Sequence, residues 1–268
     1  MSHHSDTLPR VTTTGQDRVM GRSELSASGG AFLPGRRSVL LGALGAAATG
    51  VLAARPAFAA AAPGYTLRTR ADWGADESLR FAADGTEKWP PGYYPLQTVS
   101  IHHTADGSTD PDPAARVRAI YREDAIGKKN FGDIGYHYLI DENGRVYEGR
   151  WSGTDGTPAH DARGRLVTAA HIGDYNSGNA GIALLGDLTS TPASPAARAT
   201  LIRLLADLST RHTLNPLATV RYRNPISGVT RTVPTISGHK DWAATLCPGT
   251  VHADLPAIRR EVAALLDG

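Results

Sequence analysis

The order in which strand-like and helix-like segments follow one another restricts the folds open to this chain of 268 residues. Short runs with the composition of β-strands occur at residues 97–103, 136–140, 145–149, 180–185 and, as a hairpin, 221–233. Asn143 and Gly144 lie between the second and third of these runs, and this dipeptide favours a tight hairpin turn. Amphipathic helices are predicted to begin at residues 112–113, at residues 194–195 and after Asp254.

Strands and helices do not alternate regularly in this order, and the sequence contains no GxGxxG or Walker motif. A doubly wound nucleotide-binding fold is therefore disfavoured. We predict an α/β fold: a single domain with a central mixed β-sheet flanked by about three helices.

The first 59 residues have the pattern of an export signal. Arg36 and Arg37 stand directly before an apolar run at residues 39–54, which is short and rich in Ala and Gly for a membrane span. A small-residue cleavage pattern, Ala-Phe-Ala, ends at Ala59. We predict that residues 1–59 are a twin-arginine-type signal peptide with an N-terminal extension, and that residues 60–268 are exported. The mature protein is then secreted or held at the cell wall, with no stable membrane span; an uncleaved N-terminal anchor is the alternative.

The charge of the predicted mature domain argues against a nucleic-acid partner. Residues 1–59 hold six of the 28 Lys and Arg residues and three of the 26 Asp and Glu residues. Residues 60–268 therefore carry 22 basic and 23 acidic residues, a formal net charge of −1. This lacks the basic excess typical of nucleic-acid-binding proteins. We expect the mature domain to be a monomer.

Cys247 is the only cysteine, so the chain cannot form an intramolecular disulfide. Metal coordination would explain a lone thiol in an exported protein. His102 ends a predicted strand, His239 follows another apolar stretch, and Cys247 lies eight residues beyond His239. Two histidines and a thiolate can form a zinc site that leaves a fourth position for water, as in catalytic zinc centres. From spacing alone, surface or hydrogen-bonded core histidines stay the simpler interpretation.

Five segments carry a more specific signal: RADWGA (70–75), SIHHTA (100–105), GYHYLIDENGRVYEGR (135–150), AHIGDYNSGNAGIALLGD (170–187) and GHKDWAATLCPG (238–249). In this order they resemble the zinc-dependent N-acetylmuramoyl-L-alanine amidases of type 2, which share their fold with peptidoglycan recognition proteins (PGRPs). The resemblance implies that residues 60–268 form a PGRP-like catalytic domain. It also implies that Zn²⁺ is held by His102, His239 and Cys247.

The resemblance implies roles for further residues. Tyr136, in the GYH motif, falls on a position that assists the reaction. Thr245 falls on another assisting position, where phage members carry lysine. His171 falls on a histidine of the substrate groove, and we predict that it contacts substrate together with Asn176. His103 is a third predicted substrate contact, with space filling beside the site as the alternative.

The implied reaction is hydrolysis of the amide bond between N-acetylmuramic acid and L-alanine in bacterial cell-wall peptidoglycan. Zinc would lower the pKa of its bound water towards about 7, and the hydroxide would attack the carbonyl. Tyr136 would donate a hydrogen bond to the developing oxyanion, while Thr245 would orient the water or support the same oxyanion. The alternative is a non-catalytic peptidoglycan-binding recognition module. Binding-only members commonly lack the cysteine, so Cys247 favours the enzyme.

Several other residues have a structural interpretation beside a functional one. Trp73 and Trp242 could stack on sugars, although burial is favoured for Trp73. Asp241 could orient a ligand histidine or form part of a turn. His137 is predicted to be structural, and no role is predicted for His160, His212 and His252.

Overall fold

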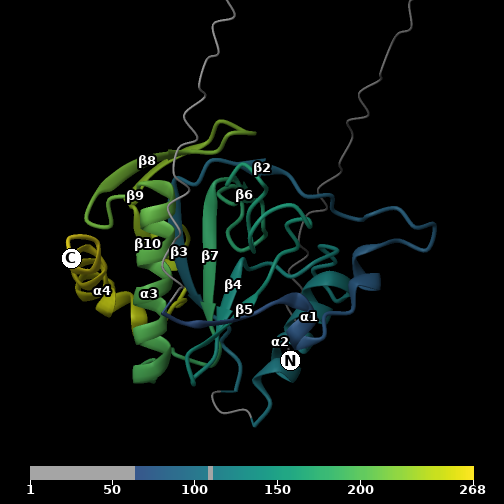
Figure 1. Cartoon of the computed structure of the whole chain (residues 1–268), viewed down its shortest axis with the longest axis horizontal. Coiled ribbons are helices and arrows are strands. Elements are labelled where there is room, and N and C mark those ends of the chain that lie inside the picture. Colours follow the sequence, from purple (N-terminus) through teal and green to yellow (C-terminus); the bar gives the residue numbers. More distant parts are fainter. Residues whose placement is uncertain (1–63, 108–110) are drawn as a thin grey trace, which may run out of the picture. The chain divides into compact units, whose positions relative to one another are not determined.

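The computed structural model describes residues 64–107 and 111–268 (Figure 1). The predicted signal peptide and its cleavage site lie outside the described residues. Among the helices of the described part of the chain, none is both long and apolar enough to cross a membrane.

A mixed sheet of six strands forms the centre of the described domain, in the order β1-β5-β4-β7-β3-β10. The strands are β1 (Thr66–Arg68), β3 (Thr98–His103), β4 (Tyr138–Ile140), β5 (Arg145–Glu148), β7 (Asn179–Leu184) and β10 (Ile236–Gly238). β3 is parallel to both β7 and β10, whereas β4 and β5 form the predicted antiparallel hairpin. Two small antiparallel pairs accompany the sheet: β2 (Tyr93–Tyr94) with β6 (Leu166–Val167), and β8 (Thr219–Arg223) with β9 (Thr230–Pro234).

Three long helices are present in the described residues: α2 (Pro113–Ile126), α3 (Pro195–His212) and α4 (Val251–Leu266). Short helices are α1 (Arg70–Trp73), η1 (Glu77–Arg80) and η2 (His239–Asp241). The side chains of Asp112 and Ser194 cap α2 and α3, each directly before a proline, which confirms the predicted helix starts. α4 begins earlier than predicted, because Val251 and Leu255 are buried and hold its first turn by packing.

The two faces of the sheet have different coverings, because side chains alternate across each strand. α3 and α4 pack on the face that carries Val99 and Ile101. α1 and α2 pack on the other face, against Leu139 and Ala183, and Figure 1 shows the two helix groups on different sides of the strands. His102 lies in register with Ala183 and therefore points to this second face.

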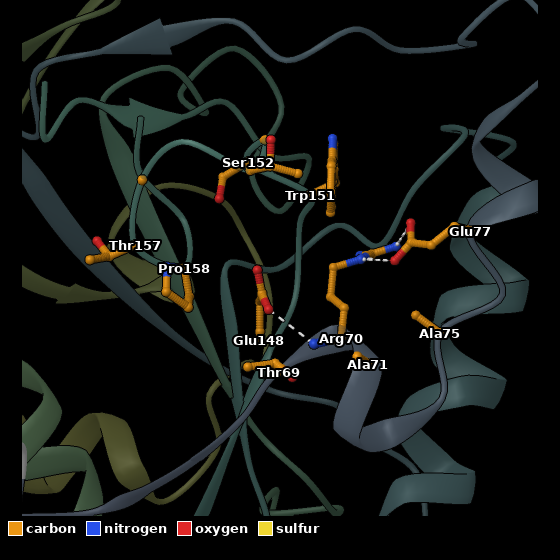
Figure 2. A pocket seen from close by; sticks show the side chains of 13 residues that line it. Thr69, Arg70, Ala71, Ala75, Glu77, Glu148, Trp151, Ser152, Thr157 and Pro158 are labelled. Carbon is orange, nitrogen blue, oxygen red and sulfur yellow. Dashed lines mark hydrogen bonds and ion pairs between the residues drawn. The ribbon is translucent and has the colours of Figure 1, made fainter. Parts of the chain in front are cut away.

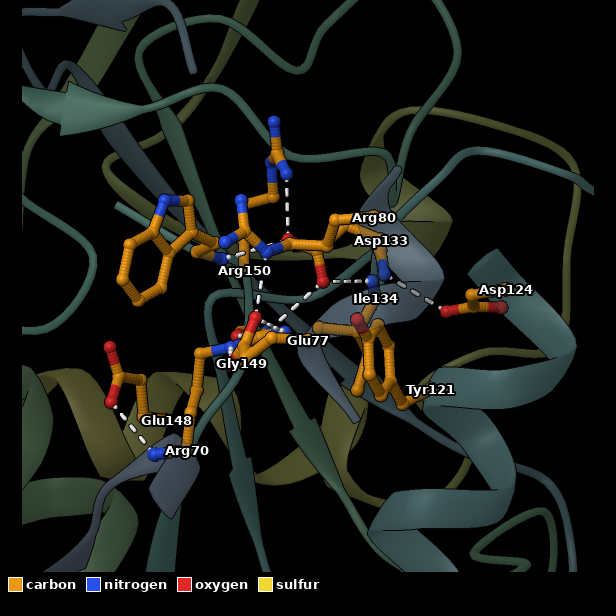
Figure 3. A network of polar contacts seen from close by, with 12 residues as sticks. Arg70, Glu77, Arg80, Tyr121, Asp124, Asp133, Ile134, Glu148, Gly149 and Arg150 are labelled. Atoms are coloured by element: carbon orange, nitrogen blue, oxygen red, sulfur yellow. Dashed lines mark hydrogen bonds and ion pairs between the residues drawn. The ribbon is translucent and has the colours of Figure 1, made fainter. Parts of the chain in front are cut away.

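A buried network of ion pairs fixes the segment that leads into β4 (Figure 3). Asp133 is fully buried and accepts hydrogen bonds from Arg70 at 3.0 Å and from Arg150 at 2.6 Å. It also accepts from two neighbouring backbone N–H groups. Arg150, a member of this network, also donates its backbone N–H to the carbonyl oxygen of Tyr136 at 2.8 Å, so the network is joined to a predicted catalytic residue.

Candidate metal centre

The structure brings the three predicted ligands together. One ligand atom from each of His102, His239 and Cys247 lies within 4.8 Å of the others. Gly238 of β10 pairs with Ile101 of β3, so the residues that follow, His239 and His102, are neighbours, and their ring centroids are 4.7 Å apart. Cys247 lies on the loop between η2 and α4, with its Sγ 3.6 Å from Nδ1 of His102.

This donor set fits zinc. A tetrahedral zinc with bonds of about 2.3 Å to sulfur and about 2.0–2.1 Å to nitrogen holds two such ligand atoms about 3.6 Å apart. The separation of Cys247 Sγ and His102 Nδ1 has this value. Burial lowers the pKa of His102 well below its usual value and also lowers the pKa of His239, so both rings are neutral and can bind metal. Burial raises the pKa of the Cys247 thiol to about 11, so a thiolate here requires a cation beside it.

Tyr136 lies next to the ligand cluster, with its ring centroid 5.3 Å from that of His102. Burial, together with nearby acidic groups, raises the pKa of Tyr136 above its usual value, so the phenol is protonated and can donate a hydrogen bond at neutral pH. Tyr136 also lines a cavity of about 310 Å³ together with Thr104, Asp106 and Lys129. There is therefore space for a ligand beside Tyr136, although none of the three candidate ligands lines this cavity.

Thr245 belongs to the loop that carries the third ligand. Its hydroxyl accepts a hydrogen bond from the backbone N–H of Cys247 at 3.2 Å. This contact helps to place the cysteine. The role of Thr245 towards a water or an oxyanion stays a prediction.

His171 and Asn176 make hydrogen bonds that the sequence did not reveal. His171 is buried, with Nδ1 3.0 Å from Nε2 of His102 and Nε2 3.0 Å from the carbonyl oxygen of Asn179. The side-chain oxygen of Asn176 accepts from the backbone N–H groups of His171 and Ile172, each at 2.8 Å. Substrate contact by His171 and Asn176 stays a prediction; what the structure adds is that His171 contacts a candidate metal ligand.

His103 does not join the cluster. It follows His102 on the same strand, so its side chain points to the opposite face of the sheet. Its Nδ1 accepts a hydrogen bond from the backbone N–H of Leu188 at 2.9 Å, and the residue is buried. This position agrees with the space-filling alternative, and substrate contact by His103 stays a prediction.

The remaining sequence candidates have structural partners. Trp73 and Trp242 are both buried, and each donates its indole N–H within the protein. Asp241 accepts a hydrogen bond from the backbone N–H of Gly238, which supports a turn. Its other carboxylate oxygen lies 2.9 Å from Nε2 of His252, which is not one of the candidate metal ligands. His137 is fully buried and bonded at both ring nitrogens, which confirms its predicted structural role.

A second cavity, of about 480 Å³, lies elsewhere on the domain (Figure 2). It is lined by Arg70, Glu148 and Trp151 among others. Glu148 pairs with Tyr138, whose side chain packs in the core on the α3 side, so Glu148 faces away from the side to which His102 points. None of the predicted ligand, catalytic or substrate residues lines this cavity. The ligand cluster is therefore the stronger candidate site.

Comparison with known proteins gives the chain its family. The family model described as N-acetylmuramoyl-L-alanine amidase matches residues 92–250, a range that contains the three candidate ligands, Tyr136 and Thr245. Peptidoglycan-recognition protein SC2 of Drosophila simulans is 29% identical over 191 residues, which are 70% of this chain and 82% of that protein. The human N-acetylmuramoyl-L-alanine amidase is 32% identical over 167 residues, which are 60% of this chain and 24% of that protein.

Solved structures show the same fold. Drosophila PGRP-LB matches with a TM-score of 0.51 and 24% identity, over 72% of this chain and 94% of that chain. Drosophila PGRP-SA matches with a TM-score of 0.51 and 22% identity, over 72% of this chain and 91% of that chain. The predicted PGRP-like fold, a mixed sheet with three long helices, is confirmed. With four of its five amidase-like segments and all three candidate ligands inside the matched range, the chain belongs to the N-acetylmuramoyl-L-alanine amidase family.

Proposed function

We propose that this protein is a zinc-dependent hydrolase that cleaves the amide bond between N-acetylmuramic acid and L-alanine in bacterial peptidoglycan. The observation that carries the proposal is the meeting of the ligand atoms of His102, His239 and Cys247 within 4.8 Å of one another, with Cys247 Sγ and His102 Nδ1 at a separation that fits zinc, inside an amidase family domain. The human relative bears the name of this activity. Three protein ligands leave the fourth position of a tetrahedral metal for the reaction.

The residues around the cluster have distinct tasks in this proposal. His102, His239 and Cys247 hold the metal, and zinc bound there would polarise the scissile carbonyl and make water nucleophilic at neutral pH. Tyr136 donates its phenolic proton in a hydrogen bond to the carbonyl oxygen as negative charge develops on it. Thr245 holds the backbone of Cys247 and thereby keeps the third ligand in place.

Export completes the proposal. Residues 1–59 direct the protein across the membrane by the twin-arginine route, and residues 60–268 act at the cell wall or outside the cell. This places the domain on the same side of the membrane as peptidoglycan. Because the twin-arginine route carries folded proteins, the metal can be bound before export.

A binding-only recognition module is the second candidate, because several relatives are named recognition proteins. It would keep the fold and bind muramyl peptides without hydrolysing them. The complete donor set with Cys247 and the protonated Tyr136 beside it favour the enzyme.

The test is the release of stem peptides from purified peptidoglycan, followed by mass spectrometry. We expect release that stops with a chelator and returns with zinc. Cys247→Ala should lose zinc and activity together, whereas Tyr136→Phe should keep zinc and lose about 10²–10³-fold in rate, as for other oxyanion donors. If the protein bound one zinc ion and bound peptidoglycan but released no stem peptide, it would instead be a recognition module.

A further inference from the structure

A series of two polar contacts joins the backbone carbonyl of Asn179, the ring of His171 and the ring of the candidate metal ligand His102. The carbonyl oxygen of Asn179 lies 3.0 Å from Nε2 of His171, and Nδ1 of His171 lies 3.0 Å from Nε2 of His102. The remaining ring nitrogen of His102, Nδ1, faces Cys247 Sγ at 3.6 Å. All three residues of this chain of contacts are buried.

The carbonyl group at one end of this series determines which ring nitrogens of His171 and His102 carry protons. A carbonyl oxygen can only accept, so Nε2 of His171 must carry the proton. In the neutral ring Nδ1 of His171 is then an acceptor, and Nε2 of His102 must donate to it. The same rule leaves Nδ1 of His102 without a proton, with its lone pair directed towards Cys247. A neutral histidine in water would instead populate both tautomers.

We propose that His171 is a positioning residue that fixes the tautomer and orientation of His102, so that Nδ1 of His102 is the metal-binding atom. This inference rests on the metal site of the proposed function and goes beyond the predicted substrate contact of His171. Groups that hold the second nitrogen of a ligand histidine generally raise metal affinity by about 10–100-fold.

The packing around His171 supports this role. Asn176 fixes the backbone at His171 and Ile172 through two hydrogen bonds of 2.8 Å. On the other side, the backbone of β7 lies against the ring: a methyl group added at Gly181 would be 2.6 Å from two carbon atoms of the His171 ring. The ring therefore has little freedom to rotate away from His102.

The test combines three variants of the full-length chain with zinc titration against a competing chelator. His171→Leu removes the acceptor, and we expect zinc to bind about 10–100-fold more weakly. His171→Asn places an amide oxygen near the position of Nδ1, and we expect affinity within about threefold of the wild type. His160→Leu is the matched control, because His160 is likewise buried and bonded at both ring nitrogens but has no hydrogen bond or ring contact with any of the three ligands. It should lower stability and leave zinc affinity unchanged.

A second measurement does not depend on any variant. In the metal-free wild type, long-range ¹H–¹⁵N correlation spectra should show His102 protonated at Nε2 and unprotonated at Nδ1. His102 protonated at Nδ1, or equal zinc affinities of His171→Leu and the wild type, would overturn the inference. A wild type that binds no zinc would overturn the proposed function, and the tautomer of His102 would still decide the inference.

Discussion

Replacement of Gly181 by alanine tests the packing beneath the candidate metal site. Gly181 lies in β7, and a Cβ atom added there would be 2.6 Å from Cγ and Cδ2 of His171 and 2.8 Å from its Nδ1. Ordinary contacts begin at 3.4 Å, so the ring must move by about 0.8 Å. The three similar distances place the methyl group over the ring, so the movement takes Nδ1 of His171 out of line with Nε2 of His102.

Two effects of opposite sign determine the stability of Gly181→Ala. Overpacking costs about 1–3 kcal/mol. Alanine also lowers the conformational entropy of the unfolded chain, which stabilises the folded state by about 0.4–1 kcal/mol. This gain applies here because the backbone of Gly181 is not left-handed and alanine can adopt it. We therefore expect a net loss of about 1–2 kcal/mol in the free energy of unfolding of the metal-free protein, measured in urea. Zinc affinity should fall by about tenfold, because the partner of His102 is displaced.

Gly173→Ala is the control, because it changes the same residue type in the same loop as His171. A Cβ atom at Gly173 meets nothing within 4 Å, and the backbone there is not left-handed. The same unfolded-chain entropy should then raise its free energy of unfolding by about 0.4–1 kcal/mol, with no clash to oppose it, and its zinc affinity should not change. If Gly181→Ala behaved like Gly173→Ala in both assays, the close contact between β7 and the His171 ring would be refuted.

Three further predictions concern other parts of the domain. Asp133→Asn should lower the free energy of unfolding in urea by about 3–5 kcal/mol, because Arg70 and Arg150 lose a buried counter-charge, whereas the exposed control Asp267→Asn should have little effect. Thr245→Val should weaken zinc binding about fivefold by removing a hydrogen bond to the ligand loop, and Thr245→Ser should restore it; equal losses in both variants would contradict this role. Burial lowers the pKa of His160 to about 4, so between pH 6.5 and 4 the unfolded chain binds a proton that the folded chain does not. Stability should therefore fall as the pH falls through this range, by about 3 kcal/mol from His160 alone, and His160→Gln should show a correspondingly smaller fall in urea unfolding.

The parts of the fold that the sequence predicts are those with short-range causes. The starts of α2 and α3 depend on caps that act within three residues, at Asp112 and Ser194. The hairpin of β4 and β5 depends on Gly144, which has a φ of 78° that glycine adopts without strain. β2, in contrast, is absent from the predicted strands, because its two residues are held by β6, which lies more than seventy positions further along the chain.

The same distinction applies to the site. The three ligands could be found because each stands in a short motif of the amidase type. The contact between His171 and His102 joins residues 69 positions apart, and no local pattern reports it. His103 stands next to a candidate ligand in the sequence motif. Because side chains alternate along a strand, however, it lies on the opposite face of the sheet.

Two of the candidate ligands are placed by strands of the sheet and the third is placed by a loop, so mutations around them should have different effects. His102 and His239 follow paired positions of the parallel strands β3 and β10, so their backbone positions are part of the sheet. Cys247 lies on a loop, where the hydrogen bond from its N–H to Thr245 and the contact of its Sγ with the N–H of His103 at 3.4 Å restrict it. Changes that loosen this loop can therefore weaken metal binding while the sheet stays folded, whereas changes between β3 and β10 should reduce metal binding and stability together. A variant series that separates these two outcomes, by zinc titration and urea unfolding of the same proteins, would show which ligand depends on the fold and which on its loop.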